Sequence, residues 1–373
     1  MDFRLNPEQQ LLRDGLARFL AERYHLAASR SAARTGAGWQ PPIWHALADE
    51  LGVLGATLPE WAGGTGGGPV ELMVISEELG RALVIEPFVE TVAVAGGLLA
   101  RAGGPEATAV LERICAGSAV VAVAVDDDGE PAHAVRDGQR WALHGTKAVV
   151  TAAPLATHLL ITARASDGLG LFLTGFDAAA PPPGARVHAY RTIDDRRAAD
   201  LVLDGLSLPP AALIDADAEA SVRQALDEGA AAVCAEAVGA MRRVLTDTVD
   251  YCRQRQQFGQ PISNFQVLAH RMVDMYCELE QSVAAVFLAM LHLAADPPTR
   301  ARAVSAAKVT VGRAARFVGQ NAVQLHGGMG MTEELAVGHY FKRLTAVQYE
   351  FGSSDFHRAR YDRLTRGNSG EGL

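Results

Sequence analysis

The feature that most constrains the fold is a basic segment, residues 253–266 with the sequence RQRQQFGQPISNFQ, that separates two long helix-forming stretches. These stretches, at about 218–255 and 264–295, consist largely of residues with high helix propensity. Gly259 and Pro261 do not suit a helix interior, so we expect them to stop the first helix. Two long helices are therefore predicted to meet at a sharp corner.

The corner carries its own signal for the start of the second helix. Ser263 and Gln266 have the spacing of a capping box, which predicts the helix start there. The corner between the two helices bears Arg255 and Phe258.

Sequence patterns typical of helices continue to the C-terminus. Further helices are predicted at about 300–326 and 333–349, with a shorter one from about 354. The pair Gly327–Gly328 is expected to stop the third helix, and Thr332 to cap the fourth. Helices of this length joined by short turns predict an up-down four-helix bundle over residues 213–373. The tail, residues 366–373, is predicted to be disordered.

The rest of the chain has two different textures. Residues 1–117 are predicted to form a helical domain, with Asn6 as an N-cap before Pro7. Residues 118–212 contain short apolar runs separated by turn residues, which predicts a small β-barrel or sandwich. Predicted strands include 119–125, 159–163, 169–173 and 201–203, with a hairpin at Asp137-Gly138 and a rigid loop at Pro181–Gly184. The fold class is mainly α with a small β domain.

Two motifs have both a binding and a structural interpretation. The glycine-rich loop at residues 58–69 lacks the strand and spacing of a dinucleotide or P-loop fingerprint, so a connector between helices is favoured over a phosphate site. The run Asp126–Asp128 offers carboxylates to a cation, but a solvated turn is favoured. We predict no metal site.

Composition excludes several classes of function. The formal net charge is −9 and no basic stripe is evident, which argues against nucleic acid as a partner. The apolar stretch 283–295 is too short to span a membrane, and residues 1–7 lack the apolar core of a signal peptide. The four cysteines are scattered, as expected for reduced, buried thiols in a cytoplasmic protein.

The corner RQQFG at 255–259 and the turn QLHGGMG at 324–330 together resemble the acyl-CoA dehydrogenase family. The run LPEWAGGTG at 58–66, followed by EELGR at 77–81, resembles the helical N-terminal domain of that family. The order of helices, barrel and four-helix bundle is also similar. The resemblance implies FAD as cofactor, α,β-desaturation of an acyl-CoA thioester (a reaction on a CH–CH group), and an electron-transfer flavoprotein or similar acceptor.

The resemblance assigns roles to individual residues. It places Arg255 against the FAD diphosphate, which a guanidinium suits because it offers a fork of donors. Phe258 would pack beside the adenosine or flavin, and Gln324, Gly327 and Gly328 would approach the cofactor of a neighbouring subunit. The alternatives are a surface arginine at a helix end, a core phenylalanine and a plain helix stop.

The barrel departs from the family pattern in two places. The loop that usually covers the flavin, with the pattern TEPxxGSD, is absent, because residues 123–131 read VAVDDDGEP. The segment GTKAVVT at 145–151 resembles the family's GxKxWIT, with Val149 in place of the tryptophan that packs on the flavin. Thr151 keeps the hydroxyl that would bond the isoalloxazine.

The catalytic base is the other departure. The family commonly places its glutamate in a YEGT segment, and this chain reads QYEFGSS from 348 to 354. Counting from the glycine turn puts Phe351 at the base position, so Glu350 is a candidate that misses it by one residue. Some relatives use the first bundle helix, where the count gives Gly229, with Glu228 beside it.

Further motifs resemble the small subunit of pimeloyl-CoA dehydrogenase. They are GGGPVE at 66–71, EPF at 86–88, QLHGGMGMTEE from 324 and GHYFKRL at 338–344. Such subunits pair with a larger homologous subunit, which would then supply the base. We therefore expect an acyl-CoA dehydrogenase that is a hetero-oligomer subunit or a homo-oligomer. The alternatives are a structural subunit that completes a partner's site and a flavin oxidase or monooxygenase. The acyl group is left open by the sequence.

Overall fold

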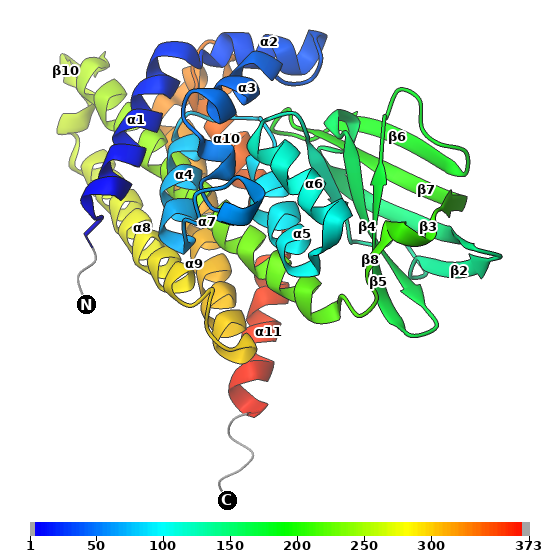
Figure 1. Cartoon of the computed structure of the whole chain (residues 1–373). Coiled ribbons are helices and arrows are strands. Elements are labelled where there is room, and N and C mark those ends of the chain that lie inside the picture. The colour runs from blue at the N-terminus through cyan, green and yellow to red at the C-terminus, as the bar shows by residue number, and fades with distance from the viewer. Residues whose placement is uncertain (1–3, 368–373) are drawn as a thin grey trace, which may run out of the picture. The chain divides into compact units, whose positions relative to one another are not determined.

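A computed structural model describes residues 4–367 of the 373-residue chain. Helices come first, strands follow and helices end the chain, as predicted (Figure 1). The first helices are α1 Pro7–Arg23, α2 Leu26–Thr35, α3 Pro41–Asp49, α4 Pro69–Arg81, the π-helix η3 Val89–Gly96, α5 Gly97–Ala102 and α6 Gly104–Cys115. The strands are β1 Val121–Ala124, β2 His133–Asp137, β3 Arg140–Thr151, β4 His158–Ala165, β5 Gly168–Gly175, β6 Ala185–Arg191, β7 Arg197–Leu208 and β8 Leu213–Asp215. The last helices are α7 Glu219–Gln254, α8 Gln266–Leu291, α9 Pro297–His326, α10 Val337–Ala346 and α11 Ser354–Gly367.

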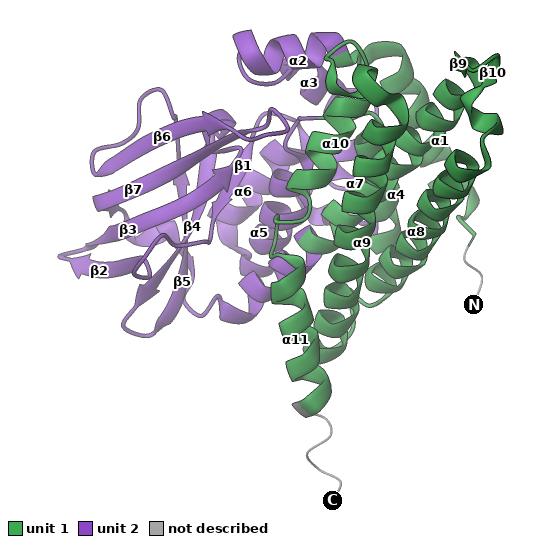
Figure 2. Ribbon diagram, turned by 180° about the vertical axis from the view of Figure 1, so that it is seen from behind, with its two compact units in different colours: residues 1–26, 69–84, 230–373 green, residues 27–68, 85–229 purple. Residues whose placement is uncertain are grey.

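The chain divides into two compact units (Figure 2). The first, here the bundle unit, comprises Met1–Leu26, Pro69–Val84 and Ala230–Leu373; the second, the sheet unit, comprises Ala27–Gly68 and Ile85–Gly229. The division passes through α7, so the first turns of that helix belong to the sheet unit. The three sequence-based domains, 1–117, 118–212 and 213–373, stay a prediction.

Local signals set the start of α1, as predicted. The Asn6 side chain accepts a hydrogen bond from the Gln9 amide at 2.8 Å, and the Gln9 side chain accepts one from the Asn6 amide at 3.0 Å. Pro7 occupies the first turn, where its missing N–H costs nothing. The helix therefore begins with a complete capping box.

Two glycines allow α4 and α7 to cross closely in the bundle unit. A Cβ on Gly80 would lie 1.9 Å from the carbonyl oxygen of Glu236, and one on Gly239 would lie 1.8 Å from that of Glu77. No side chain fits at such distances, so the backbones themselves are in contact. This crossing fixes the part of α7 that carries Glu236.

Two predicted helix starts are wrong. Ser263 lies inside the 3-10 helix η6 Ile262–Asn264, and α8 begins after Phe265 without a side-chain cap, so the capping box with Gln266 does not form. Thr332 ends the 3-10 helix η7 Gly327–Met331, where its hydroxyl donates to Met329 O, and does not cap a helix. The predicted helix 333–349 is the shorter α10, so the fourth bundle helix is much shorter than the other three.

The predicted barrel is, within the described residues, one eight-stranded sheet with the order β6-β7-β3-β2-β4-β5-β8, and β1 pairs in parallel with β4. The predicted hairpin is confirmed, since Asp137 pairs with Arg140 and Gly138 has a positive φ of 59°. The loop Pro181–Gly184 lies between β5 and β6, also as predicted. Strand β6 was missed, although its sequence ARVHAYR alternates apolar and polar residues; its residues are exposed or only partly buried.

The cysteines and the chain ends complete the comparison with the sequence. Cys234 and Cys252 are buried and all four thiols are free, but Cys277 is exposed, contrary to the prediction of buried thiols. Helix α11 continues through Gly367, two residues into the tail that was predicted to be disordered, and residues 368–373 lie outside the described part of the chain. Within residues 4–367, each helix is either too short or too polar to span a bilayer.

Candidate functional site

The corner between α7 and α8 is a tight β-hairpin, which sequence reasoning did not foresee. Helix α7 ends at Gln254, before the predicted stops, and β9 Gln256–Gln257 pairs with β10 Gln260–Pro261. The two turn residues, Phe258 and Gly259, have φ values of 54° and 78°. Two positive φ values in a two-residue loop are the signature of a type I′ turn.

Phe258, at the tip of this hairpin, has an exposed side chain and an unfavourable backbone conformation. Its side chain is 90% exposed, and its ring meets Phe265 only edge-on, with centroids 6.0 Å apart. A bulky residue rarely adopts a positive φ, and burial of the Phe258 side chain does not offset the cost of this conformation. The interpretation of Phe258 as a core residue is therefore wrong for the isolated chain.

Arg255 precedes the hairpin and is also exposed. Its backbone is held at both sides, because its amide donates to Tyr251 O at 2.8 Å and its carbonyl accepts from the Ile262 amide at 2.8 Å. Its guanidinium forms no hydrogen bond or ion pair with any described residue. The corner thus presents a guanidinium without a partner among the described residues, beside an exposed aromatic ring.

The second predicted motif lies at the end of α9. The helix stops at Gly327, as predicted, with φ 60° and ψ −137° there and the Gly327 amide donating to Gln324 O. A Cβ on Gly327 or Gly328 would meet nothing within 4 Å, whereas one on Gly330 would lie 2.6 Å from Val323 O. The first two glycines therefore face open space, and Gly330 is required for packing.

A pair of stacked rings joins the two motifs. Tyr251, one turn before Arg255, stacks on His326, the residue before Gly327, with ring centroids 4.3 Å apart and an interplanar angle of 26°. The Tyr251 hydroxyl donates to His326 O at 3.3 Å. Sequence reasoning missed this pair, although each member is adjacent to a motif. It places the ends of α7 and α9 side by side.

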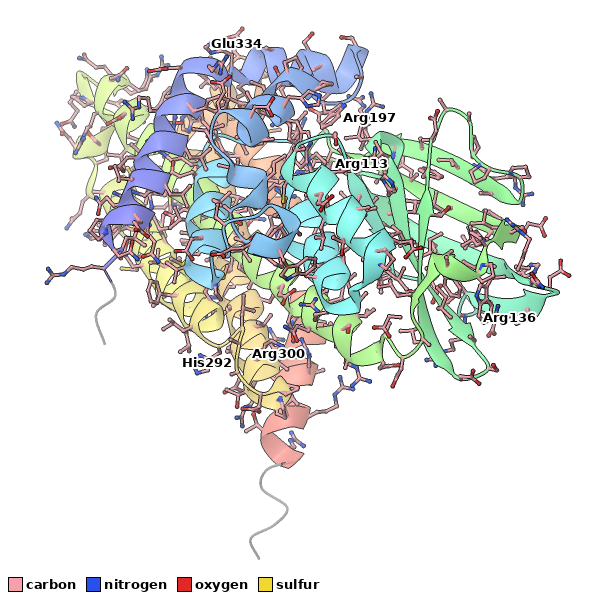
Figure 3. The ribbon with its side chains drawn as sticks, viewed as in Figure 1. Arg113, Arg136, Arg197, His292, Arg300 and Glu334 are labelled. Atoms are coloured by element: carbon pink, nitrogen blue, oxygen red, sulfur yellow. The ribbon has the colours of Figure 1, made fainter. Side chains whose placement is uncertain are left out.

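Both motifs lie at one end of the bundle unit. Glu334, which follows the glycine turn, lies at the end opposite His292 and Arg300, which flank the α8–α9 connection (Figure 3). The groups gathered there are a free guanidinium, an exposed aromatic ring and a glycine pair without neighbours. These are the groups that a dinucleotide diphosphate and its flanking rings require, so the residues fit FAD.

Thr151 belongs to the sheet unit, at the end of β3, where it pairs with Ala198 of β7. The β3–β7 ladder is irregular between Lys147 and Val150, and Val149 in this bulge has a φ of 49° and a side chain that is 57% exposed. A β-branched residue with positive φ is a genuine outlier. The Asp200 carboxylate holds the bulge by accepting from the Val149 amide at 2.9 Å.

The turn after β1 is tied to a buried lysine. Lys147 Nζ lies 2.6 Å from Asp127 Oδ1 and donates to Val125 O and Thr162 Oγ1 at 3.0 and 3.1 Å. Burial lowers the pKa of Lys147 and the Asp127 carboxylate opposes that shift. Asp127 is therefore not simply solvated, and residues 4–367 contain no cluster of three or more potential metal ligands.

Glu350 lies in the turn after α10, and its carboxylate is engaged. Arg343 forms a bidentate pair with Glu350 and another with Glu236, whose oxygens lie 2.8 and 2.9 Å from the guanidinium. Arg343 and Glu236 are each only 3% exposed. Glu350 is thus part of a buried charge cluster.

The same turn is fixed through its backbone. Lys308, which is 2% exposed, donates to Val347 O at 2.8 Å and to Glu350 O at 2.6 Å. Phe351 follows with a φ of 55°, and its carbonyl oxygen lies 2.9 Å from His357 Nε2. Burial lowers the pKa of Lys308 and raises that of the neighbouring Cys234 to about 11.

The other candidate carboxylate is engaged in a similar way. Glu228, in the first part of α7, forms a bidentate pair with Arg101 at 2.8 and 3.0 Å. It also accepts from the Gln224 side chain at 3.0 Å. Each glutamate beside a predicted base position is therefore bound by an arginine of its own unit.

Comparison with known proteins identifies the family. The family models for the acyl-CoA dehydrogenase N-terminal and C-terminal domains match residues 6–124 and 220–363. The chain is 30% identical over 345 residues to the acyl-CoA dehydrogenase IpdE2 of Mycobacterium tuberculosis, and the alignment covers 90% of each protein. It is 31% identical over 324 residues to FadE27 of the same organism, covering 83% of each.

Solved structures agree. The chain resembles the ChsE4–ChsE5 complex from Mycobacterium tuberculosis with 26% identity and a TM-score of 0.91, covering 100% of both chains. It resembles a variant of the Tcur3481–Tcur3483 steroid ACAD with 29% identity and a TM-score of 0.85, covering 98% of this chain and 99% of the other. The resemblance seen in the motifs is confirmed: the chain belongs to the acyl-CoA dehydrogenase family of FAD-dependent enzymes.

Proposed function

We propose that this chain is one subunit of a hetero-oligomeric acyl-CoA dehydrogenase and that a homologous partner supplies the catalytic carboxylate. The observation that carries the proposal is the state of Glu350 and Glu228. Both carboxylates are held in bidentate pairs, by Arg343 and Arg101. A general base must reach the proton it removes, and a carboxylate clamped with both oxygens on a guanidinium is turned away from that task.

Two of the similar structures support the hetero-oligomer. Their descriptions name two proteins each, the ChsE4–ChsE5 complex and the Tcur3481–Tcur3483 steroid ACAD. We extend this arrangement to the present chain, with a larger homologous subunit as its partner. A homo-oligomer in which one of the two glutamates is released from its arginine is the competing arrangement.

The contribution of this chain would be to hold the cofactor. Arg255 would donate to the diphosphate oxygens, and Gly327 and Gly328 would let the backbone approach the dinucleotide. Phe258 would leave solvent by packing on the adenosine or flavin, and Gln324 would offer its exposed amide. Bound FAD would supply the acceptor for the β-hydrogen of the acyl group, which leaves as a hydride.

Thr151 would contact the isoalloxazine, and Val149 would affect which acyl group fits beside it. The Thr151 hydroxyl would bond the flavin ring system, and Val149 presents a smaller side chain than the tryptophan expected there. A smaller side chain suits a bulky acyl group, and a similar structure is described as a steroid ACAD. We therefore propose a steroid-derived acyl-CoA as substrate, with pimeloyl-CoA as the alternative, and an electron-transfer flavoprotein as acceptor in the cytoplasm.

A second candidate function follows from the same glutamates. The chain would be a structural subunit that completes the flavin and substrate site of its partner without reacting itself. Purifying the chain alone and then co-expressed with a homologous large subunit separates the two. A yellow assembly whose flavin bleaches under anaerobic steroid acyl-CoA, with Arg255→Ala reducing its flavin content, supports the first proposal.

The contrary outcomes are equally distinct. An assembly that keeps full flavin content and turnover when Arg255 is replaced shows that this chain only completes the site of its partner. Bleaching by pimeloyl-CoA and not by the steroid thioester would replace the proposed substrate. Oxygen consumption without an added acceptor would identify an oxidase.

A further inference from the structure

We propose that Tyr251 and His326 are a positioning pair that sets the spacing between the two halves of the cofactor site, the Arg255 corner and the Gly327–Gly328 turn. This inference rests on the proposed function, since it assumes that the two halves bind one FAD. It concerns residues that need not touch the cofactor. Their effect would be to hold the groups that do.

On the α7 side, Tyr251 controls the corner through the backbone. Its carbonyl accepts from the Arg255 amide at 2.8 Å, so the two residues share the last helical turn. The Arg255 carbonyl in turn accepts from the Ile262 amide, which closes the base of the hairpin. A shift of Tyr251 therefore moves the guanidinium and the Phe258 tip together.

On the α9 side, His326 is held in one orientation. Its Nδ1 lies 2.8 Å from Ala322 O, which can only accept, so Nδ1 carries the proton. Its carbonyl accepts from the Tyr251 hydroxyl at 3.3 Å. That carbonyl belongs to the peptide before Gly327, where the chain leaves the helix with φ 60° and ψ −137°.

The binding groups of the two halves do not fix the spacing by contacts of their own. The Arg255 guanidinium has no partner among the described residues, and a Cβ on Gly327 or Gly328 would meet no atom within 4 Å. The stack, with ring centroids 4.3 Å apart, is buried at His326 and half-buried at Tyr251. An FAD that bridges both halves would thus depend on this contact for preorganisation.

The test is the dissociation constant for FAD of the assembled enzyme, measured by flavin fluorescence on reconstitution with FAD. Tyr251→Leu and His326→Leu remove the stack and should each raise the constant about 3- to 10-fold, the range for a lost aromatic pair. Tyr251→Phe keeps the ring and should stay within about 3-fold of the wild type. The double variant should be no worse than the worse single one, because both break the same contact.

A control separates positioning from general stability. Trp141→Leu breaks another aromatic contact, the edge-on pair with Phe172 at 5.5 Å in the sheet unit. It should lower the melting temperature without changing FAD affinity. If a Leu variant does not fold, Tyr251→Phe and His326→Phe still compare loss of the hydroxyl with loss of the Nδ1 bond.

Two results would overturn the inference, and they differ. Leu variants with wild-type FAD affinity, in an assembly where Arg255→Ala weakens it, would make Tyr251 and His326 merely structural while the proposed function survives. A wild-type assembly that binds no FAD would remove both the inference and the proposed function.

Discussion

Two turns of the bundle unit correspond to parts of the family's site, and they differ in what surrounds their charged and aromatic groups. At the α7–α8 corner, Arg255 has no partner among the described residues and Phe258 is 90% exposed with a positive φ. In the turn after α10, Glu350 is paired with Arg343, and Lys308 binds two of the turn's carbonyls. The first turn is incomplete by itself, and the second is complete.

The difference shows how to separate a binding role from a structural one when both turns match a motif. Groups that bind something else stay uncommitted in the isolated chain, and the chain tolerates their exposure or strain. Groups that hold the fold together satisfy one another in buried clusters, where an unpaired charge would be costly. On this basis we propose that the corner is a ligand surface and that the turn after α10, which resembles the base-carrying segment of the family, is a structural joint.

The largest effect, on the free energy of unfolding, should come from removing Arg343 from the buried charge cluster. Arg343→Met leaves the Glu236 carboxylate, 3% exposed, without its guanidinium. Removing one partner of a buried pair costs about 3–5 kcal/mol of unfolding free energy. Urea denaturation measures the loss, and Arg358→Met, which removes an exposed pair with Asp355, serves as control and should change stability by about 0.5 kcal/mol or less. A loss at Arg343 no larger than the control's would mean that the cluster does not hold the turn.

The next effect should come from the corner and should leave stability unchanged. Arg255→Ala removes a charge-assisted contact to the FAD diphosphate worth about 1.5–3 kcal/mol, so the assembly should lose flavin on gel filtration. The matched control is Arg253→Ala, two residues away, whose exposed guanidinium pairs with Asp250. Equal flavin content in both variants would count against the corner as a ligand surface.

A smaller effect with a distinct pH signature is expected at Lys308. Lys308→Met leaves the carbonyls of Val347 and Glu350 without a donor, a loss of about 1–3 kcal/mol that is partly offset because a buried charge is also removed. Burial lowers the folded-state pKa of Lys308 below its ordinary value of 10.5. Between the lowered pKa and 10.5 the unfolded chain binds more protons, so this residue makes the wild type more stable as pH rises.

The measurement is the difference in urea midpoint between wild type and Lys308→Met across pH 7 to 10. The wild-type advantage should grow with pH and level off near the ordinary pKa of lysine. A difference that does not change with pH would show that Lys308 titrates as in the unfolded chain.

Local signals made much of the fold predictable. The Asn6 cap and Pro7 act within one turn, and the Gly327 stop depends on its own φ, so a sequence pattern contains the information. The capping box predicted from the S-x-x-Q spacing of Ser263 and Gln266 does not form. Ser263 is part of the 3-10 helix that follows the hairpin, and residue spacing alone does not reveal that.

The site was predictable only in part, because its decisive contacts join distant residues. Arg255 and Gly327 were found from motifs, but the stack of Tyr251 on His326 spans 75 residues, and the pairing of Arg343 with Glu236 spans 107. The type I′ turn at Phe258 was missed because phenylalanine is not a residue that predicts a positive φ. The role of Glu350 depends on which charge it meets: it pairs with Arg343, seven residues earlier, and Glu236 of α7 holds the same guanidinium.

The most direct test of the account is an anaerobic titration of the assembly carrying both Glu350→Gln and Glu228→Gln with its acyl-CoA, followed by flavin absorbance. If neither glutamate of this chain is the base, the flavin should still bleach, at a rate close to that of the wild type, because neither substituted carboxylate removes the proton. An assembly with normal FAD content whose flavin no longer bleaches would contradict the account and return the base to this chain.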